Sequence, residues 1–459
     1  MDLNSLFSPK AIAVIGASPE EGKIGNVILT NLKGSYKGKI YPINPKYDHI
    51  LGMNCYKNIS EIEGEIDLAI ISLPSKYVIS SFKECQDKKV KYVIIVTAGF
   101  KEIGGEGEKL EDELKNIIAQ GETRVIGPNT VGIYIPRNGI STALTVKERS
   151  GMPGNGNIAY ISQSGALGLL LLDVFAYQNI GVHSFINLGN RVDLNENTLI
   201  DYLADQKEVK SIMMYLESFS DGKEFFEIAK KVTQKVPIVL LKGGITQSGQ
   251  KAASHHTGAM MRSMEHLEGV LKQCGVIKAS DETELVDYAL ALSNLPLMRG
   301  NKIAILTTAG GVGVTCSDII SKSNVLHIAN LSEQTKKEIM GIIPPIGSAN
   351  NPIDMTVEAT NEQYQEIIKL LNNTDEVDAM IVFALFQSPK VDENLIAMLD
   401  RLKNGKPLII GNIGGSFSHD MVCKAMSLGI PFYPSITRTV KAAEALYKYS
   451  IIRGEANGN

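Results

Sequence analysis

Two adjacent histidines, His255 and His256, follow a stretch rich in glycine, serine and threonine that begins after Lys242. An unprotonated imidazole is well populated near neutral pH, so a histidine on a glycine-rich loop can attack phosphorus and pass the phosphoryl group on. Metal ligation is disfavoured, because adjacent histidines rarely face one ion and no cysteine or aspartate stands nearby at ligand spacing. The pattern favours a phosphate carrier on a mobile loop.

A second candidate site lies between a strand-like run and an apolar helix, in Ser162-Gln163-Ser164-Gly165-Ala166. Hydroxyls and free amides at a helix N-terminus can hold an oxyanion or a phosphate. As an isolated feature, the same residues could be only a helix cap.

Glu217 closes the predicted strand at residues 212–216. A carboxylate at the end of a strand can accept the N–H of an imidazole, which fixes the tautomer and leaves the other nitrogen free to attack. Taken alone, Glu217 could equally be a surface residue or a helix cap.

The turn after the first predicted strand is of the dinucleotide-binding kind. It reads Val14-Ile15-Gly16-Ala17-Ser18, and Gly22 and Gly25 follow. Glycines let the backbone approach a phosphate, and the helix N-terminus offers free N–H groups and the positive end of a dipole. Since the spacing is not GxGxxG, a tight turn without a ligand stays open.

The end of the second predicted strand, residues 40–43, discriminates between ligands. A nicotinamide-binding fold usually places an acidic residue there to bind ribose, whereas this chain has Asn44-Pro45-Lys46. Lys46 favours a ligand with an extra phosphate, such as coenzyme A with its 3′-phosphate or NADP. Lys46 could also be a solvated turn residue.

Further turns follow later strands of the same predicted sheet. They contain Pro74, Thr97 with Ala98, and Asn129. Ligands of open α/β sheets bind at the carboxyl ends of the strands, so we expect these residues to lie at the same edge as Gly16.

The elements that hold these turns alternate between strands and helices. Continuous apolar runs indicate buried strands of parallel sheets. They occupy residues 11–16, 67–73, 92–97, 124–126, 157–162, 211–216, 237–241, 302–307, 379–384 and 407–411. Helical stretches such as 105–120 and 222–233 separate them. We therefore predict an α/β fold of doubly wound sheets throughout the chain.

Length and loop signals indicate how the chain is divided. Its 459 residues exceed one ordinary core and suggest about three domains of ~150 residues. Residues 137–157 lack sustained periodicity, and residues 295–301 separate a helix from the third set of strands. We predict domains at 1–140, 150–296 and 297–459.

Composition excludes several classes of protein. The net charge is −4, with 21% charged and 44% hydrophobic residues, which is typical of a globular protein. The chain has no cluster of basic residues of the kind that would indicate nucleic-acid binding. The five cysteines are scattered without metal-ligand spacing, which indicates reduced thiols. Neither a signal segment nor an apolar run of ~20 residues is present, so we expect a cytoplasmic protein without a membrane segment.

Several short motifs recur together in one known family. They are residues 13–18, 43–46, 97–104, 127–129, 162–168, 215–217, 256–258, 308–314 and 351–354. By their number and order, the whole chain resembles the α subunit of ADP-forming acetyl-CoA (acyl-CoA) synthetases, relatives of succinyl-CoA synthetase. The resemblance implies a Rossmann-like CoA-binding domain followed by two flavodoxin-like CoA-ligase domains.

The resemblance also implies roles for the residues. Coenzyme A or acetyl-CoA would be bound by Gly16, Ala17, Ser18, Lys46, Pro74, Thr97, Ala98 and Asn129. Phosphate would be bound by Gln163, Ser164 and Gly165, and the catalytic pair would be His256 and Glu217. Phosphate attacks the thioester, the histidine takes the phosphoryl group from the acyl phosphate, and its loop carries the group to ADP and Mg²⁺. Since all three domains are accounted for, the nucleotide site would lie on an ATP-grasp β subunit, in an α2β2 assembly.

The chain departs from the family pattern in two places. The family usually has Ser-His-Thr-Gly, and counting back from Thr257-Gly258 selects His256 rather than His255. The family's common Gly-Pro-Asn-Cys ends here in Thr130, so a thiol at that position is not essential to this chain. Two other functions stay open: a non-catalytic CoA-binding sensor on the same scaffold, and an NADP-dependent oxidoreductase, for which no hydride-transfer residues follow.

Overall fold

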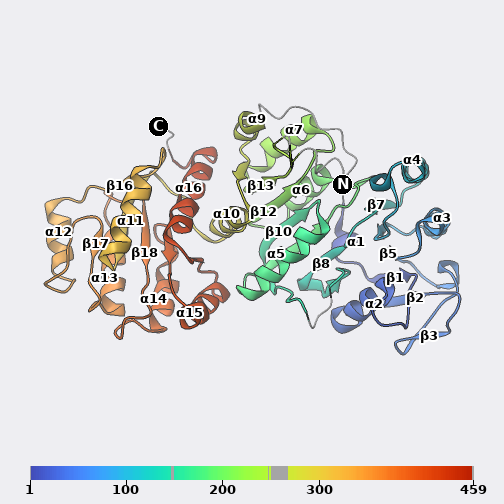
Figure 1. Cartoon of the computed structure of the whole chain (residues 1–459), viewed down its shortest axis with the longest axis horizontal. Coiled ribbons are helices and arrows are strands. Elements are labelled where there is room, and N and C mark those ends of the chain that lie inside the picture. Colours follow the sequence, from blue (N-terminus) through green and yellow to red (C-terminus); the bar gives the residue numbers. More distant parts are fainter. Residues whose placement is uncertain (1, 146–148, 247, 250–266, 457–459) are drawn as a thin grey trace. The chain divides into compact units, whose positions relative to one another are not determined.

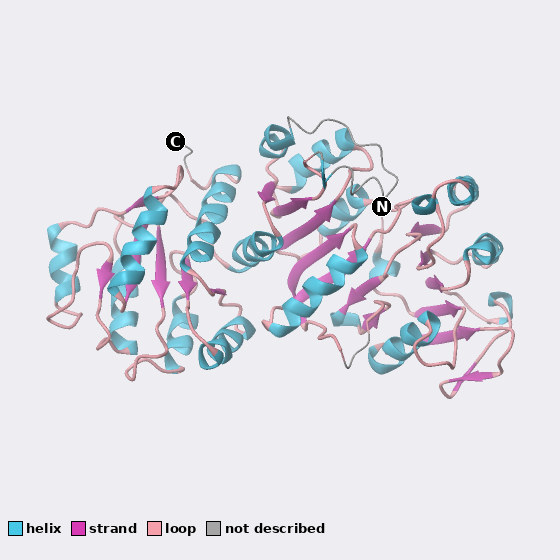
Figure 2. Cartoon of the chain, in the orientation of Figure 1, coloured by secondary structure: helices cyan, strands magenta, loops and turns pink. Residues whose placement is uncertain are grey.

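The structure, a computed structural model, describes residues 2–145, 149–246, 248–249 and 267–456. Over these residues, helices alternate with mostly parallel strands (Figure 1, Figure 2), which confirms the predicted α/β class. The chain forms two compact units. The first comprises Met1–Tyr177, Gly181–Val232 and Leu240–Cys274, and the second comprises Gln178–Ile180, Thr233–Val239 and Gly275–Asn459.

The first sheet is five-stranded and wholly parallel, with the order β2-β1-β5-β6-β7. Its strands are β1 (Ala11–Ile15), β2 (Lys39–Ile43), β5 (Leu68–Ile71), β6 (Tyr92–Ile95) and β7 (Arg124–Ile126). Every residue of β1, β5 and β6 is buried, which explains their uninterrupted apolar sequences. The strand order reverses at β1, so the turns after β1 and β5 flank a switch point.

The helices that follow these strands are α2 (Ile24–Ser35), α3 (Val78–Asp87) and α4 (Glu106–Ile118). Side chains of α3 and α4 close one core against Ala13, Ala69 and Val93 of the sheet. The short elements of this part are α1 (Asn4–Phe7), β3 (His49–Ile50), β4 (Met53–Asn54), η1 (Ile59–Glu61), η2 (Ser75–Tyr77), η3 (Lys101–Ile103) and η4 (Pro136–Asn138).

The second sheet has the order β14-β13-β12-β10-β11-β8-β9. Its strands are β8 (Ile133–Ile135), β9 (Ile140–Ser141), β10 (Asn155–Ser162), β11 (Val182–Asn187), β12 (Ser211–Leu216), β13 (Ile238–Lys242) and β14 (Ile277–Ala279). The accompanying helices are α5 (Gly165–Tyr177), α6 (Glu196–Leu203), α7 (Gly222–Val232), α9 (Leu267–Gln273) and α10 (Glu282–Asn294). The parallel strand β10 lies between β11 and β12, and this position is a second switch point.

Two strands near the predicted end of the first domain, residue 140, join this sheet. β8 pairs antiparallel with β11, and β9 pairs antiparallel with β8. The chain therefore enters the second sheet at Ile133, before the predicted boundary at residue 140, and the predicted boundaries stay predictions. Strands of two and three residues are too short to show a periodic pattern in the sequence.

The third sheet contains β15 (Lys302–Thr307), β16 (His327–Ile328), β17 (Ile353–Asp354), β18 (Ala379–Phe383), β19 (Leu408–Gly411) and β20 (Phe432–Tyr433). Its helices are α11 (Gly310–Ser321), α12 (Glu333–Met340), α13 (Asn361–Asn372), α14 (Asn394–Leu402), α15 (Ser416–Ser427) and α16 (Ile436–Ile452). Side chains of α12 to α15 form one continuous core against this sheet. No helix in the described residues is both long enough and apolar enough to cross a bilayer.

Candidate functional site

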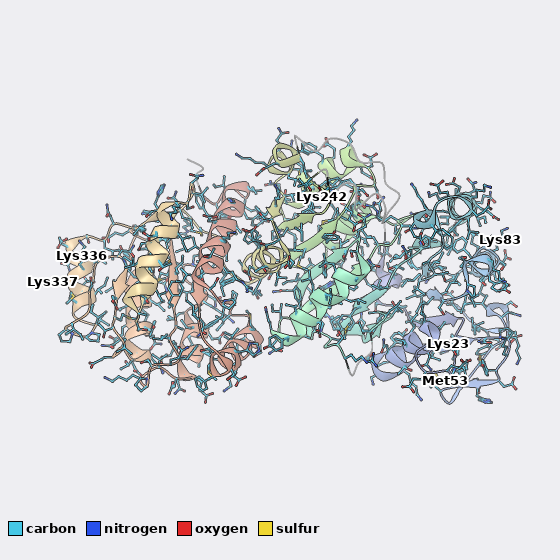
Figure 3. All side chains as sticks on the ribbon, in the orientation of Figure 1. Lys23, Met53, Lys83, Lys242, Lys336 and Lys337 are labelled. Carbon is cyan, nitrogen blue, oxygen red and sulfur yellow. The ribbon has the colours of Figure 1, made fainter. Side chains whose placement is uncertain are left out.

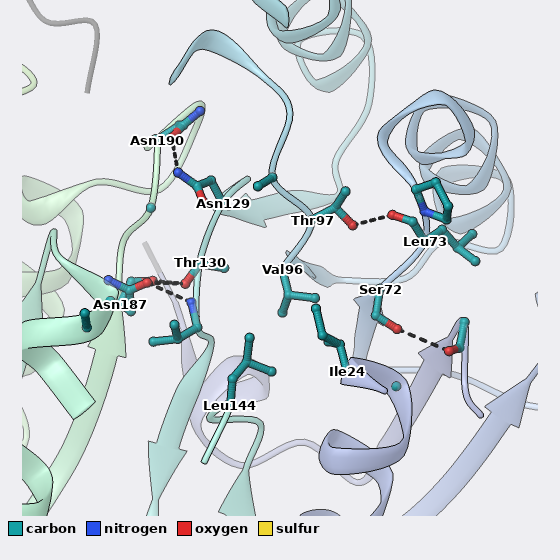
Figure 4. A pocket seen from close by; sticks show the side chains of 18 of the residues that line it. Ile24, Ser72, Leu73, Val96, Thr97, Asn129, Thr130, Leu144, Asn187 and Asn190 are labelled. Carbon is teal, nitrogen blue, oxygen red and sulfur yellow. Dashed lines mark hydrogen bonds between the residues drawn. The ribbon is translucent and has the colours of Figure 1, made fainter. Parts of the chain in front are cut away.

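A cavity of about 710 Å³ opens in the first unit where the carboxyl ends of parallel strands of the first two sheets meet (Figure 4). One side is formed by turns after β1, β5, β6 and β7, and the other by turns after β10, β11 and β12. Both switch points therefore open into the same cavity. In Figure 4, the side chains of Ile24, Val96 and Leu144 face its interior and give it an apolar surface.

The turn after β1 requires its glycines. Gly16 has a φ of +90°, and a Cβ on it would lie 2.7 Å from the carbonyl oxygen of Ser72. A Cβ on Gly25 would lie 2.0 Å from the carbonyl oxygen of Gly16. The start of α2 thus approaches the turn so closely that only glycine fits, and this brings the helix N-terminus to the cavity.

Two side chains, those of Thr97 and Glu102, hold the loop after β6 in place. The Thr97 hydroxyl donates to the Leu73 carbonyl at 2.6 Å (Figure 4), and the Glu102 carboxylate accepts the Gly99 amide at 2.6 Å. Burial raises the pKa of Glu102, but hydrogen bonds from Asn190 and from the Gly99 amide outweigh burial and hold that pKa below its usual value. Glu102 is therefore an ionised anchor for this loop.

Asn129 and its neighbours join the two sides of the cavity. Asn129 has a φ of +59°, and its side-chain amide donates to the Asn190 side chain at 3.3 Å. The buried Asn187 side chain accepts the Thr130 hydroxyl at 2.9 Å and the Val131 amide at 2.8 Å, as Figure 4 shows. Its own amide group donates to the Ser162 carbonyl at 2.8 Å. Asn187 thereby fastens the loop after β7 to the end of β10.

The turn after β10 combines a helix cap with a helix N-terminus that faces the cavity. The Ser164 hydroxyl accepts the Leu167 amide at 3.4 Å, so Ser164 caps α5. The first amides of a helix have no partner within the helix, and Ser164, Gly165 and Ala166 all line the cavity. A Cβ on Gly165 would lie 2.7 Å from Val131 Cγ1, which explains the glycine at the start of this helix. The geometry suits an anion at the helix start.

Gln163 and Glu217 are held together beside this turn. The Gln163 side-chain oxygen accepts the backbone amides of Glu217 at 2.8 Å and of Ser218 at 3.1 Å. Glu217 Oε1 accepts the Tyr215 hydroxyl at 3.4 Å, whereas Oε2 is buried without a hydrogen-bond partner among the described residues. A buried carboxylate oxygen that lacks a partner is costly, so Glu217 has an acceptor available for an incoming donor.

Most of the predicted site residues line this one cavity. They are Gly16, Ser18, Pro74, Thr97, Ala98, Asn129, Gln163, Ser164, Gly165 and Glu217.

Two predicted CoA contacts lie elsewhere. Ala17 is fully buried, and its carbonyl accepts the Asn44 side-chain amide at 2.7 Å. Lys46 is exposed and does not line the cavity. His255 and His256 lie outside the described residues.

The structure adds residues that the sequence did not single out. Asn187 is the last residue of β11 and Asn190 lies in the turn after it. The sequence did not reveal this strand, because His183 and Ser184 interrupt its apolar run. The signal that could have identified them is a polar residue at a strand end followed by Gly189. A third, Arg191, donates to the Ser218 hydroxyl at 2.6 Å and to the fully buried Glu196 at 3.0 Å.

Three family models match successive parts of the chain. The CoA binding domain matches residues 10–136, the succinyl-CoA ligase like flavodoxin domain matches residues 155–292, and the ligase-CoA domain matches residues 303–449. Together with the shared cavity, these matches define the class: an α/β protein built from a CoA-binding domain and CoA-ligase domains.

Full-length relatives define the family within that class. The chain is 39% identical to subunit alpha of ADP-forming acetate–CoA ligase II from Pyrococcus furiosus, over 99% of this chain and 100% of that relative. It is 36% identical to subunit alpha of ligase I from the same organism, over 98% of each. The chain belongs to the family of α subunits of ADP-forming acetate–CoA ligases.

A solved structure has the same fold over nearly the whole length. It is that of Ca. Korarchaeum cryptofilum dinucleotide forming acetyl-coenzyme A synthetase 1 in complex with phosphate and ADP. The TM-score is 0.91 at 34% identity, over 99% of this chain and 98% of that one. This similarity confirms the predicted fold class and the family resemblance.

Proposed function

We propose that the chain is the CoA-binding subunit of an enzyme that reversibly converts acetyl-CoA or another acyl-CoA, ADP and phosphate into the free acid, ATP and CoA. The observation that carries this proposal is the single cavity shared by the switch points of the first two sheets. The matched CoA-binding domain contributes one side of it and the succinyl-CoA ligase like domain the other. The names of the full-length relatives support the overall reaction.

In the first step, a phosphate oxygen attacks the thioester carbon, the C–S bond breaks, and CoA leaves as the thiolate. The start of α5 supports this step, since the amides near Ser164 and Gly165 face the cavity and favour an anion there. Turns at Gly16 and Thr97 offer main-chain groups to the other end of the thioester ligand. The products are an acyl phosphate and CoA.

In the second step, an imidazole nitrogen of His256 attacks phosphorus, the bond to the acyl oxygen breaks, and the free acid leaves. Glu217 Oε2 supports this assignment, because it is an acceptor without a partner at the edge of the cavity. By accepting the N–H of the imidazole, Glu217 fixes the tautomer that has a free nitrogen. The phosphoryl group is then held on nitrogen.

In the third step, ADP takes the phosphoryl group from nitrogen, and the imidazole is restored. We assign ADP and Mg²⁺ to an ATP-grasp β subunit in an α2β2 assembly. The designation "subunit alpha" of the full-length relatives supports the existence of a partner. ADP-forming acetate–CoA ligase from Methanocaldococcus jannaschii is longer, and the chain covers 64% of it at 36% identity.

Reconstitution tests the proposal. The purified chain and a candidate ATP-grasp subunit are assayed, separately and together, for ATP formation from acetyl-CoA, ADP, phosphate and Mg²⁺. We expect ATP only from the mixture, dependent on phosphate and accompanied by stoichiometric CoA release. Calorimetry with CoA and with NADPH accompanies the assay.

Three outcomes contradict the proposal. CoA binding without turnover in the mixture would indicate a non-catalytic sensor. Binding of NADPH without binding of CoA would indicate an oxidoreductase. ATP formation by the chain without a partner would refute the division of labour between subunits.

A further inference from the structure

Lys242, labelled in Figure 3, ends β13 at the carboxyl edge of the second sheet. Only 3% of this residue is exposed, and it is the one buried lysine or arginine in the described part of the chain. Lysine is almost never buried unless it is paired. Its burial therefore requires an explanation from its contacts.

The ammonium of Lys242 binds main chain instead of a carboxylate. Nζ donates to the carbonyl of Glu217 at 2.5 Å and to the carbonyl of Gly243 at 2.5 Å. Among the described residues, no carboxylate lies within ion-pair distance of it. One charged group thus ties Glu217, the residue that follows β12, to Gly243, the residue that follows β13.

Charged groups on the neighbouring elements act on Lys242 in opposite directions. Burial lowers the pKa of Lys242 to about 8, the Glu217 carboxylate raises it, and the Arg191 guanidinium lowers it. Tyr215, which lies in β12 two residues before Glu217, is neutral in this range, since burial and Glu217 raise its pKa to about 12. Lys242 is therefore mostly charged at pH 7 and mostly neutral at pH 9.

Burial of the protonated Lys242 side chain lowers the free energy of unfolding. The folded pKa of about 8 lies below the ordinary value of 10.5, so the folded chain binds fewer protons than the unfolded chain between these values. Stability consequently rises as pH increases from about 8 to 10.5, and protonated Lys242 lowers stability at pH 7. A lysine retained at a cost to stability points to a role in function.

We propose that Lys242 is a positioning residue for phosphoryl transfer, whose ammonium fixes the main chain at Glu217 relative to Gly243, the first residue of the segment that leads to His256. The inference rests on the proposed function, in which Glu217 orients the imidazole of His256. Misplacing a catalytic group by about 1 Å can slow a reaction roughly 100-fold. The positive charge also favours the approach of an anionic phosphoryl group.

Three variants test this role. Lys242→Met keeps an unbranched side chain but removes the charge, and Lys242→Arg keeps the charge up to high pH. Lys231→Met is the matched control, because Lys231 lies in α7 of the same unit and is exposed, with an ion pair to Asp201. Each is mixed with the ATP-grasp subunit, labelled ATP and Mg²⁺, and the rate of acid-labile phosphate incorporation is measured at pH 7 and pH 9.

We expect Lys242→Met to be labelled roughly 100-fold more slowly than wild type at pH 7, with an unchanged CoA affinity and no lower melting temperature. Labelling of wild type and of Lys231→Met should decline in parallel from pH 7 to pH 9. Labelling of Lys242→Arg should decline less, because the charge of its arginine persists at pH 9. A residue with only a structural role would lower the melting temperature and leave the pH profiles parallel.

The proposal is overturned if Lys242→Met is labelled at the wild-type rate. If Lys242→Met does not fold, the pH profile of Lys242→Arg decides, and a profile parallel to wild type overturns the proposal. If neither variant folds, Lys242 is a structural residue and the proposal is wrong. Absence of label on wild type would contradict the proposed function itself, which is a distinguishable result.

Discussion

The two sides of the cavity have switch points of the same kind but differ in how they use charge. On the side of the first sheet, Gly16, Ser72, Thr97 and Asn129 present neutral side chains and main-chain groups. The one lysine that lines this side, Lys23, is more than half exposed and pairs with Glu20 at 2.8 Å.

Behind the side of the second sheet, outside the lining of the cavity, charged groups are buried. Glu196 is fully buried, Lys242 is 3% exposed, and the Arg191 side chain is 9% exposed. Burying charge is expensive even when the groups are paired. Under the proposed function, the difference teaches that the first side recognises CoA through shape and main chain, whereas the second maintains a costly electrostatic field where a phosphoryl group is to be moved. Variants of the charged groups on the second side should therefore lower kcat, and variants of the first side should raise KM for CoA.

The largest expected effect comes from His256. Removing the nucleophile in His256→Ala should lower ATP formation by about 10³-fold or more, whereas His255→Ala should retain most activity. Steady-state rates with the partner subunit measure both. The opposite order would show that His255 is the carrier, and full activity of both variants would refute a histidine carrier.

Glu217→Gln should have the next largest effect. An amide in place of the buried Oε2 loses the charge that stabilises the orientation of the imidazole, so kcat should fall roughly 100-fold while KM for CoA stays unchanged. Glu208→Gln, at an exposed ion pair with Arg137, is the control and should behave as wild type. A rise in KM for CoA without a fall in kcat would show that Glu217 acts in CoA recognition, and would contradict the difference proposed between the two sides of the cavity.

Gly165→Ala should weaken the phosphate site alone. The new Cβ would meet Val131 Cγ1 at 2.7 Å and displace the start of α5. We expect KM for phosphate to rise about 10-fold, the equivalent of one lost charge-assisted hydrogen bond. The matched control is Gly222→Ala at the start of α7, where a Cβ meets nothing within 4 Å. Equal effects of the two substitutions would contradict a phosphate site at α5.

Lys46→Ala should have the smallest effect. Lys46 is exposed and lies outside the lining of the cavity, so its interaction with the 3′-phosphate of CoA would contribute about 1 kcal/mol or less, a change in KM of about 5-fold. The KM for dephospho-CoA should be the same for Lys46→Ala as for wild type. An equal rise in KM for CoA and for dephospho-CoA would show that Lys46 does not contact the 3′-phosphate.

The sequence predicted the parts of the fold and site that depend on local patterns. β1, β12 and β15 were identified because buried parallel strands are continuous apolar runs. The turns at Gly16 and Ser164 were identified because strand, turn and helix follow one another directly along the chain.

The parts that escaped prediction depend on contacts between distant segments. Asn187 binds Thr130 across 57 residues, and no sequence pattern marks such a pair. The burial of Lys242 could not be predicted, since lysine is normally exposed and no sequence pattern marks its hydrogen bonds to the carbonyls of Glu217 and Gly243. Lys46 is exposed and does not line the cavity, and its contact with the 3′-phosphate of CoA stays a prediction.

The central claim is that this chain carries the phosphoryl group between acyl phosphate and ADP, and a pulse-chase measurement tests it most directly. The chain and its ATP-grasp partner are incubated with acetyl-CoA, labelled phosphate and Mg²⁺, and ADP is then added. We predict label on His256 that is stable to base and lost in acid, and that passes quantitatively to ATP on addition of ADP. ATP formation without a labelled histidine on this chain would contradict the account.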